Sequence, residues 1–261
     1  GNHMFEKIKC FILDMDGTIY LGNELFPFTK DFLKKVEDTG REYYFFTNNS
    51  SKSQQAYIEK LGKLGIQIKK DQMMTSSHVI VKYLKEHYEG KSIYVLGTQS
   101  LIQEFQYFDM NLTEEDPDIV VLGFDTTLTY EKLSKACHYI RNGCIYFGIN
   151  PDWNCPMEGG AFIPDCGSIA KLIEASTGRF PEFFGKPSKH TLDYIIQETG
   201  YEPDEIAIVG DRLYTDIAVA DQSDVTSILV LSGESTREDV KTSDVKPNVI
   251  LEDLSEITKM L

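Results

Sequence analysis

Short apolar runs alternate with stretches in which apolar residues recur every three or four positions, along almost the whole chain. The runs predict buried strands at residues 10–13, 43–46, 92–96, 118–122, 144–149, 205–209, 226–231 and 248–251. The amphipathic stretches predict helices at residues 29–39, 51–64, 76–88, 101–108, 130–141, 168–176 and 189–199, and from 254 onward. Regular alternation of strands and helices indicates an α/β fold with parallel sheets.

The three strands predicted within residues 92–149 follow one another closely enough to form a small sheet of their own. An irregular stretch rich in Pro and Gly, residues 150–167, separates them from the later strands. The chain has no repeat, low-complexity tract or long linker, so we expect any second domain to be an insertion into the first.

Composition narrows the class of protein. The 261 residues are 41% hydrophobic and 26% charged, which is ordinary for a globular chain. The 41 acidic against 26 basic residues give a net charge of -15, which argues against partners such as nucleic acid or an anionic membrane. No apolar run approaches the roughly 20 residues of a membrane span and no signal peptide is apparent, so we expect a soluble, cytoplasmic protein.

Five scattered cysteines without a C-x-x-C pair favour reduced thiols over disulfides or structural zinc.

The strongest chemical signal is the segment Asp14-Met15-Asp16-Gly17-Thr18, where the first predicted strand ends. Carboxylates at i and i+2 of an extended backbone project to the same side, and open α/β folds place their sites at this edge of the sheet. Such a pair suits two different roles. One carboxylate is ionised and acts as nucleophile or metal ligand, and the other is protonated and acts as general acid. An ordinary Asp-Gly turn is the alternative.

Two further motifs offer groups that bind anions. Thr47-Asn48-Asn49-Ser50 follows the second predicted strand and supplies a hydroxyl and amides, although on its own a plain helix N-cap is the better explanation. Lys186, within Gly-Lys-Pro ahead of a predicted helix, could neutralise a phosphate oxygen, and a solvated surface lysine is the alternative.

The last motif is Gly210-Asp211-Arg212-Leu213-Tyr214-Thr215-Asp216, which follows the strand at 205–209. Asp211 and Asp216 lie five residues apart in a turn, where together they can hold a hard cation such as Mg²⁺. Either acid alone could be a turn or capping residue. The four motifs together, each at the end of a predicted strand or just ahead of a helix, favour a common site.

In their order and setting these motifs resemble those of the haloacid dehalogenase-like phosphatases, and more narrowly those of the NagD branch, the type IIA phosphatases. The resemblance covers nearly the whole chain and includes TNNS, GKP, GDRL-x-TDI and the VLSGE that follows a strand. It implies a Rossmann-like core built from residues 4–76 and 184–261, with an inserted α/β cap of the C2 type at residues 77–183.

The resemblance also implies a role for each motif residue. Asp14 would attack phosphorus and become an aspartyl phosphate, and Asp16 would protonate the leaving oxygen and then activate water. The cofactor would be Mg²⁺, held by Asp14, the backbone carbonyl of Asp16, Asp211 and Asp216. The phosphoryl oxygens would be bound by Thr47, Asn48 and Lys186.

The expected activity is hydrolysis of a small phosphorylated metabolite, since this branch includes enzymes for nucleotide, sugar, phosphoglycolate and pyridoxal phosphates. Substrate identity, and whether two copies associate through the cap, stay open. A phosphotransferase or mutase would use the same intermediate. A phosphoaspartate signalling module is disfavoured because Asp16 supplies an acid and base, and because such a module has no use for the insertion.

Two loops of the cap, residues 150–156 and 164–167, are expected over the site. Relatives usually carry Gly or another small residue where this chain has Asp165, and an added carboxylate there would disfavour a second anionic group on the substrate. Trp153, the single Trp, is expected to pack inside the cap.

Overall fold

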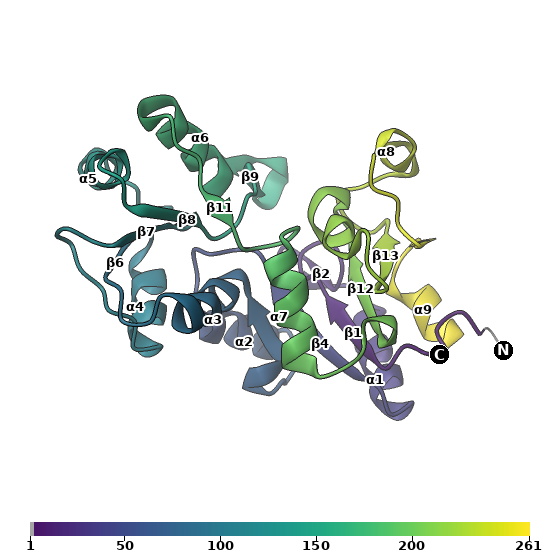
Figure 1. Cartoon of the computed structure of the whole chain (residues 1–261). Helices are drawn as coiled ribbons and strands as arrows, with labels where there is room; N and C mark the ends of the chain where they lie inside the picture. Colours follow the sequence, from purple (N-terminus) through teal and green to yellow (C-terminus); the bar gives the residue numbers. More distant parts are fainter. Residues whose placement is uncertain (1–2) are drawn as a thin grey trace. The chain divides into compact units, whose positions relative to one another are not determined.

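A computed structural model describes residues 3–261 (Figure 1). The chain forms two compact units, which we call the core unit and the inserted unit. The core unit combines the residues up to Thr47 with Ile58–Met74 and Lys186–Leu261, and the inserted unit consists of Asn48–Tyr57 and Thr75–Gly185. The chain passes between the units at four points, and two of these, after Met74 and after Gly185, lie two residues from the limits at 76/77 and 183/184 expected from the sequence. Residues 48–57, however, belong to the inserted unit rather than to the core.

The core unit is built on a six-stranded sheet with the order β14-β13-β12-β1-β4-β5. Its strands are β1 (Cys10–Leu13), β4 (Glu42–Thr47), β5 (Met73–Thr75), β12 (Ile206–Gly210), β13 (Thr226–Val230) and β14 (Val249–Leu251). Strand β1 pairs in parallel with β4 on one side and β12 on the other, and Leu13 is aligned with both Phe45 and Val209. All four residues of β1 are buried, as expected for a central strand covered on both faces.

The helices of the core unit form where an apolar face can pack on this sheet. Helix α1 (Thr29–Asp38) buries Phe32, Leu33 and Val36, and the chain leaves it through Gly40, whose φ of +79° suits glycine. The other helices and helical turns with residues in this unit are α2 (Gln54–Lys63), η1 (Lys70–Gln72), α7 (Lys189–Thr199), η3 (Pro203–Glu205), η4 (Leu213–Ile217), η5 (Ala218–Ala220), α8 (Arg237–Thr242) and α9 (Leu254–Met260). A small hairpin, β2 (Tyr20–Leu21) and β3 (Glu24–Leu25), follows the first motif.

The inserted unit has its own four-stranded parallel sheet with the order β11-β8-β7-β6. Its strands are β6 (Ile93–Leu96), β7 (Ile119–Leu122), β8 (Ile145–Gly148) and β11 (Glu182–Phe183). Its helices are α3 (Ser76–His87), α4 (Gln99–Tyr107), α5 (Tyr130–Arg141) and α6 (Cys166–Thr177). The irregular stretch contains a hairpin of β9 (Asn154–Pro156) and β10 (Phe162–Pro164), joined through η2 (Glu158–Gly160).

The prediction of an α/β fold with parallel sheets is confirmed. Helices α5 and α7 have the predicted limits, whereas the two-residue strands β2, β3 and β11 and the short helix α8 were not signalled by any periodic pattern. The five cysteines, all within the described range, are free. No helix in residues 3–261 is long and apolar enough to cross a membrane.

Candidate active site

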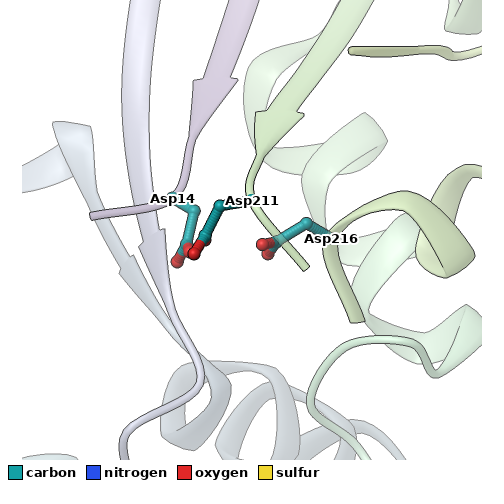
Figure 2. Close-up of side chains that lie close together, drawn as sticks. All are labelled: Asp14, Asp211 and Asp216. Atoms are coloured by element: carbon teal, nitrogen blue, oxygen red, sulfur yellow. The ribbon is translucent and has the colours of Figure 1, made fainter. Parts of the chain in front are cut away.

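Three carboxylates meet at the carboxyl edge of the core sheet. Asp14 leaves β1 and Asp211 leaves the neighbouring β12, and since these strands run in parallel register, both acids emerge side by side. Asp216 comes from the π-helical turn η4 that follows β12. One oxygen from each carboxylate lies within 4.8 Å of the other two, and Figure 2 shows the three side chains turned toward one another.

Glycines fix where two of these carboxylates lie. A Cβ atom on Gly17 would stand 2.3 Å from Oδ2 of Asp211, and one on Gly233 would stand 2.1 Å from the same oxygen. A Cβ atom on Gly210 would stand 2.3 Å from the Cβ of Asp216. The carboxylates therefore occupy space that any other residue would fill. Gly17 is required for a second reason, because its φ of +86° lies in the left-handed region.

The segment after β13 binds Asp211 directly. The Glu234 N–H donates to Oδ2 of Asp211 at 2.8 Å, and the Ser235 N–H donates to its backbone oxygen at 3.2 Å. The other carboxylate oxygen of Asp211, Oδ1, is buried and has no hydrogen-bond partner among the described residues. The VLSGE segment thus positions a site residue, a role that its sequence alone did not reveal.

A buried lysine faces the carboxylates. The Nζ of Lys186 lies 2.5 Å from Oδ1 of Asp216 and 3.4 Å from Oδ1 of Asp14, and the lysine side chain is only 4% exposed. This excludes the alternative of a solvated surface lysine. Arg212 lies in the same region, with its N–H donating to Oδ2 of Asp216 at 3.2 Å and its Nε 3.8 Å from Oε1 of Glu234.

The surroundings of the three carboxyl groups shift their pKa values in different directions. Burial disfavours the ionised form of Asp14, but Lys186 and Arg212 outweigh it and lower the pKa of Asp14 below its usual value. Burial, followed by repulsion from Asp14, raises the pKa of Asp216 to about 7. Burial and the two neighbouring carboxylates raise the pKa of Asp211 well above its usual value. The protein therefore holds Asp14 as an anion beside two acids that are costly to ionise.

Asp16 stands apart from this cluster. Its Oδ1 accepts a hydrogen bond from the Gly22 N–H at 3.1 Å, in the hairpin of β2 and β3. Among residues 3–261, the group of carboxylates close enough together to hold a metal ion consists of Asp14, Asp211 and Asp216 and does not include the Asp16 carboxylate. The acid and base role of Asp16 stays a prediction.

The second motif is divided between the two units. Thr47 is the last residue of β4, beside β1, and is buried in the core unit. Asn48 begins the inserted unit, where its Nδ2 donates to Oδ1 of Asp152 at 2.9 Å. The segment is not a helix N-cap, because α2 begins only at Gln54, whose N–H donates to Oε2 of Glu104.

The structure argues against two expectations for the inserted unit. Asp165 is buried and is the N-cap of α6, with its Oδ1 accepting hydrogen bonds from the Cys166 N–H at 2.6 Å and from Nδ2 of Asn150 at 2.9 Å. Its carboxylate is thus committed to the inserted unit's own structure, which removes the basis for a role in selecting substrate charge. Trp153 is 60% exposed rather than packed, and Nζ of Lys171 lies 5.9 Å from the centroid of its ring.

Comparisons with known proteins match this architecture. A family model described as haloacid dehalogenase-like hydrolase matches residues 11–111, and a second, described as HAD-hydrolase-like, matches residues 183–257. An acid sugar phosphatase of Staphylococcus aureus strain MRSA252 is 34% identical over 252 residues, which are 96% of this chain and 97% of the relative.

Solved structures of known proteins are also similar to this chain in fold and in sequence. The crystal structure of 4-nitrophenylphosphatase from Thermotoga maritima is 42% identical and superimposes with a TM-score of 0.95, covering 98% of both chains. NagD from Escherichia coli K-12 is 30% identical with a TM-score of 0.87, covering 95% of this chain and 98% of NagD.

A parallel α/β core with clustered carboxylates and a buried lysine at its carboxyl edge is the architecture of haloacid dehalogenase-like hydrolases, and the chain belongs to this family. Within the family it is a NagD-like, type IIA enzyme and a phosphomonoesterase.

Proposed function

We propose that this enzyme is a Mg²⁺-dependent phosphatase that hydrolyses small phosphomonoesters through an aspartyl phosphate on Asp14. The observation that carries the proposal is the electrostatic setting of Asp14. Lys186 and Arg212 keep its pKa low, while the two neighbouring acids have raised pKa values. An ionised carboxylate at the edge of the sheet is the state that a nucleophile needs.

The residues present suit a hard divalent cation. The donors are carboxylate oxygens, which Mg²⁺ prefers, and they lie within 4.8 Å of one another. Oδ1 of Asp211 is buried without a hydrogen-bond partner in the described part of the chain, so a cation would satisfy it. A cation would also relieve the repulsion that raises the pKa values of Asp211 and Asp216. We infer that Asp14, Asp211, Asp216 and the backbone carbonyl of Asp16 hold the ion.

The reaction has two halves. In the first, an oxygen of Asp14 forms a bond to phosphorus as the ester P–O bond breaks, and Asp16 gives its proton to the leaving oxygen. In the second, Asp16 takes a proton from a water molecule whose oxygen bonds to phosphorus, releasing phosphate and the free carboxylate of Asp14. Mg²⁺, when bound, would neutralise charge on the phosphoryl group and keep Asp14 ionised.

The remaining motif residues would bind the phosphoryl group. Lys186 places a cation next to the nucleophile, and we infer that it, Thr47 and Asn48 hold the phosphoryl oxygens through both halves of the reaction. Local positive charge matters because a net charge of -15 repels anionic substrates at long range.

The substrate that we propose is a small phosphorylated metabolite. Relatives named acid sugar phosphatase and 4-nitrophenylphosphatase support a small phosphomonoester and leave its identity open. Five free cysteines are consistent with a reducing, cytoplasmic location.

The test is phosphate release from a panel of phosphomonoesters, with Mg²⁺ or with EDTA, by the wild type, Asp14→Asn and the control Asp38→Asn. Asp38 is an exposed helical residue of the core unit, so its variant controls for the loss of one negative charge. We expect release that requires both Mg²⁺ and Asp14 and that is unchanged in Asp38→Asn. Full activity of Asp14→Asn would refute the proposed nucleophile, and isomerised phosphoester without free phosphate would show a mutase.

A further inference from the structure

The chain passes between its two units at four points, and two of them adjoin predicted phosphate ligands. Thr47 is the last residue of the core unit at the first crossing, and Asn48 is the first of the inserted unit. At the last crossing, Gly185 ends the inserted unit and Lys186 begins the core. Interactions that fix the positions of Asn48 and Gly185 therefore also restrict the positions of Thr47 and Lys186, because one peptide bond joins each pair.

Inside the inserted unit the segments from three crossings are fastened together. The Ser76 hydroxyl donates to the backbone oxygen of Asn48 at 3.0 Å. A Cβ atom on Gly185 would lie 2.8 Å from Oδ1 of Asn48 and 2.9 Å from the backbone oxygen of Ile149, so glycine is needed for this close approach. The Gly185 N–H donates to that same oxygen of Ile149 at 2.6 Å. We call Asn48, Ser76 and Gly185 the crossing cluster.

A buried polar network of the inserted unit is hydrogen-bonded to the crossing cluster. We call it the hub, and it consists of Asn150, Ser50, Asp152 and Asp165. Asn150 is fully buried, and its Nδ2 donates at 2.9 Å to Oδ1 of both Asp152 and Asp165. Its Oδ1 accepts from the Ser50 hydroxyl at 2.5 Å. Both amide hydrogens and the amide oxygen of Asn150 are thus engaged.

The hub reaches the crossing cluster through one atom. Oδ1 of Asp152 accepts from Nδ2 of Asn150 and also from Nδ2 of Asn48, each at 2.9 Å. Ser50, the other end of the hub, lies two residues beyond Asn48, and its Oγ also accepts from the Phe124 N–H at 2.8 Å. The second motif, residues 47–50, is therefore hydrogen-bonded at residues 48 and 50 to the segment that follows β8.

Burying carboxylates carries a large desolvation penalty, and apolar residues of similar volume often stabilise a domain more. A satisfied polar network does fix geometry, because each hydrogen bond is directional and a half-satisfied arrangement is costly.

We propose that Asn150 and Asp152 are positioning residues for the reaction, acting through the crossing cluster to set where Thr47 and Lys186 hold the phosphoryl group. This inference rests on the proposed function. It adds that phosphate affinity is controlled from the segment after β8, which belongs to the inserted unit.

The test compares Asp152→Leu, which removes the shared acceptor, with Asp152→Asn, whose amide oxygen can still accept from both neighbours. Asp125→Leu is the matched control. Asp125 is another buried carboxylate of the inserted unit, accepting from the Thr127 N–H at 2.9 Å, from the Thr127 hydroxyl at 2.7 Å and from Lys132, neither of which belongs to the crossing cluster. The readouts are kcat, KM and the inhibition constant of inorganic phosphate, with 4-nitrophenyl phosphate as substrate, plus thermal unfolding.

For Asp152→Leu we expect kcat/KM to fall and the inhibition constant of phosphate to rise, by about 10- to 100-fold, as for an ångström-scale misplacement. Asp152→Asn should stay within about threefold of the wild type, because it keeps both hydrogen bonds. Asp125→Leu should lower the unfolding temperature without changing the inhibition constant of phosphate.

Ser76→Ala keeps the test decisive if Asp152→Leu fails to fold, since it removes only the hydroxyl that holds the Asn48 carbonyl. It should raise the inhibition constant of phosphate by about fivefold, the value of one ordinary hydrogen bond. Unchanged phosphate inhibition in Ser76→Ala, or an equal loss in Asp125→Leu, overturns the positioning role. An inactive wild type would instead count against the proposed function, so the two failures are distinguishable.

Discussion

The contact between Gly233 and Asp211 makes a sharp prediction for Gly233→Ala. The added methyl would stand 2.1 Å from Oδ2, 2.6 Å from Cγ and 2.7 Å from Cβ of Asp211, whereas ordinary contacts begin at 3.4 Å. Rotating the carboxylate does not relieve a clash with Cβ, so the backbone after β12 or after β13 must move. The hydrogen bond from the Glu234 N–H to Oδ2 would be lost with it.

We expect this displacement, of the order of 1 Å, to lower kcat/KM about 100-fold and to raise the Mg²⁺ concentration needed for half-maximal activity. Gly62→Ala is the control, because its Cβ would meet the Gln67 side chain at an ordinary 3.5 Å from Nε2 and 3.9 Å from Oε1, and because alanine favours the helix α2 in which it lies. The assay is phosphate release over a Mg²⁺ titration. If Gly233→Ala stays within threefold of the wild type, Asp211 is not held where we infer, or its position does not matter.

Three further predictions follow from the site. The folded protein binds a proton at Asp216 up to a pKa of about 7, against an ordinary value of 3.8, so in EDTA its stability should fall as pH rises from 5 to 7.5. Urea unfolding at both pH values checks this, and the slope should flatten in Asp216→Asn. Lys186→Met should lower the free energy of unfolding by about 3 kcal/mol, because it leaves buried carboxylates uncompensated. It should also lower activity about 100-fold, and activity within tenfold of the wild type would contradict this. Asp165→Ala should lose about 2 kcal/mol in urea unfolding, through the lost helix cap and the stranded amide of Asn150. It should leave the ratio of rates on bisphosphates and monophosphates unchanged, and a rise in that ratio would restore a role in substrate selection.

How much of this structure the sequence predicts depends on whether a feature rests on local patterns or on contacts between residues far apart in the chain. The strand and helix pattern needs only local periodicity, which is why β1, α5 and α7 are found where expected. The carboxylates could be grouped because parallel strands end at a common edge, so Asp14 and Asp211 meet even though 196 residues separate them.

Other features depend on contacts that no local pattern encodes. The sequence places Asp165 before a helix, but it does not show the hydrogen bond from Asn150, fifteen residues away, that holds the carboxylate inside the inserted unit. The sequence favours a Trp153 packed within the cap, yet this residue lies exposed just ahead of β9. The placement of Asn48 with the inserted unit depends on its hydrogen bond to Asp152, far along the chain.

The position of β1 in the core sheet has a consequence for the making of the protein. Its neighbour β4 is synthesised within about two seconds at about 20 residues per second, but its other neighbour, β12, begins at Ile206 and emerges about ten seconds later. Until then one edge of β1 has no strand to pair with. Both Asp211 and Asp216 lie beyond that point, so a nascent or prematurely terminated chain carries Asp14 without the two carboxylates that lie beside it. The order of synthesis thus withholds the complete carboxylate cluster until most of the chain has been made.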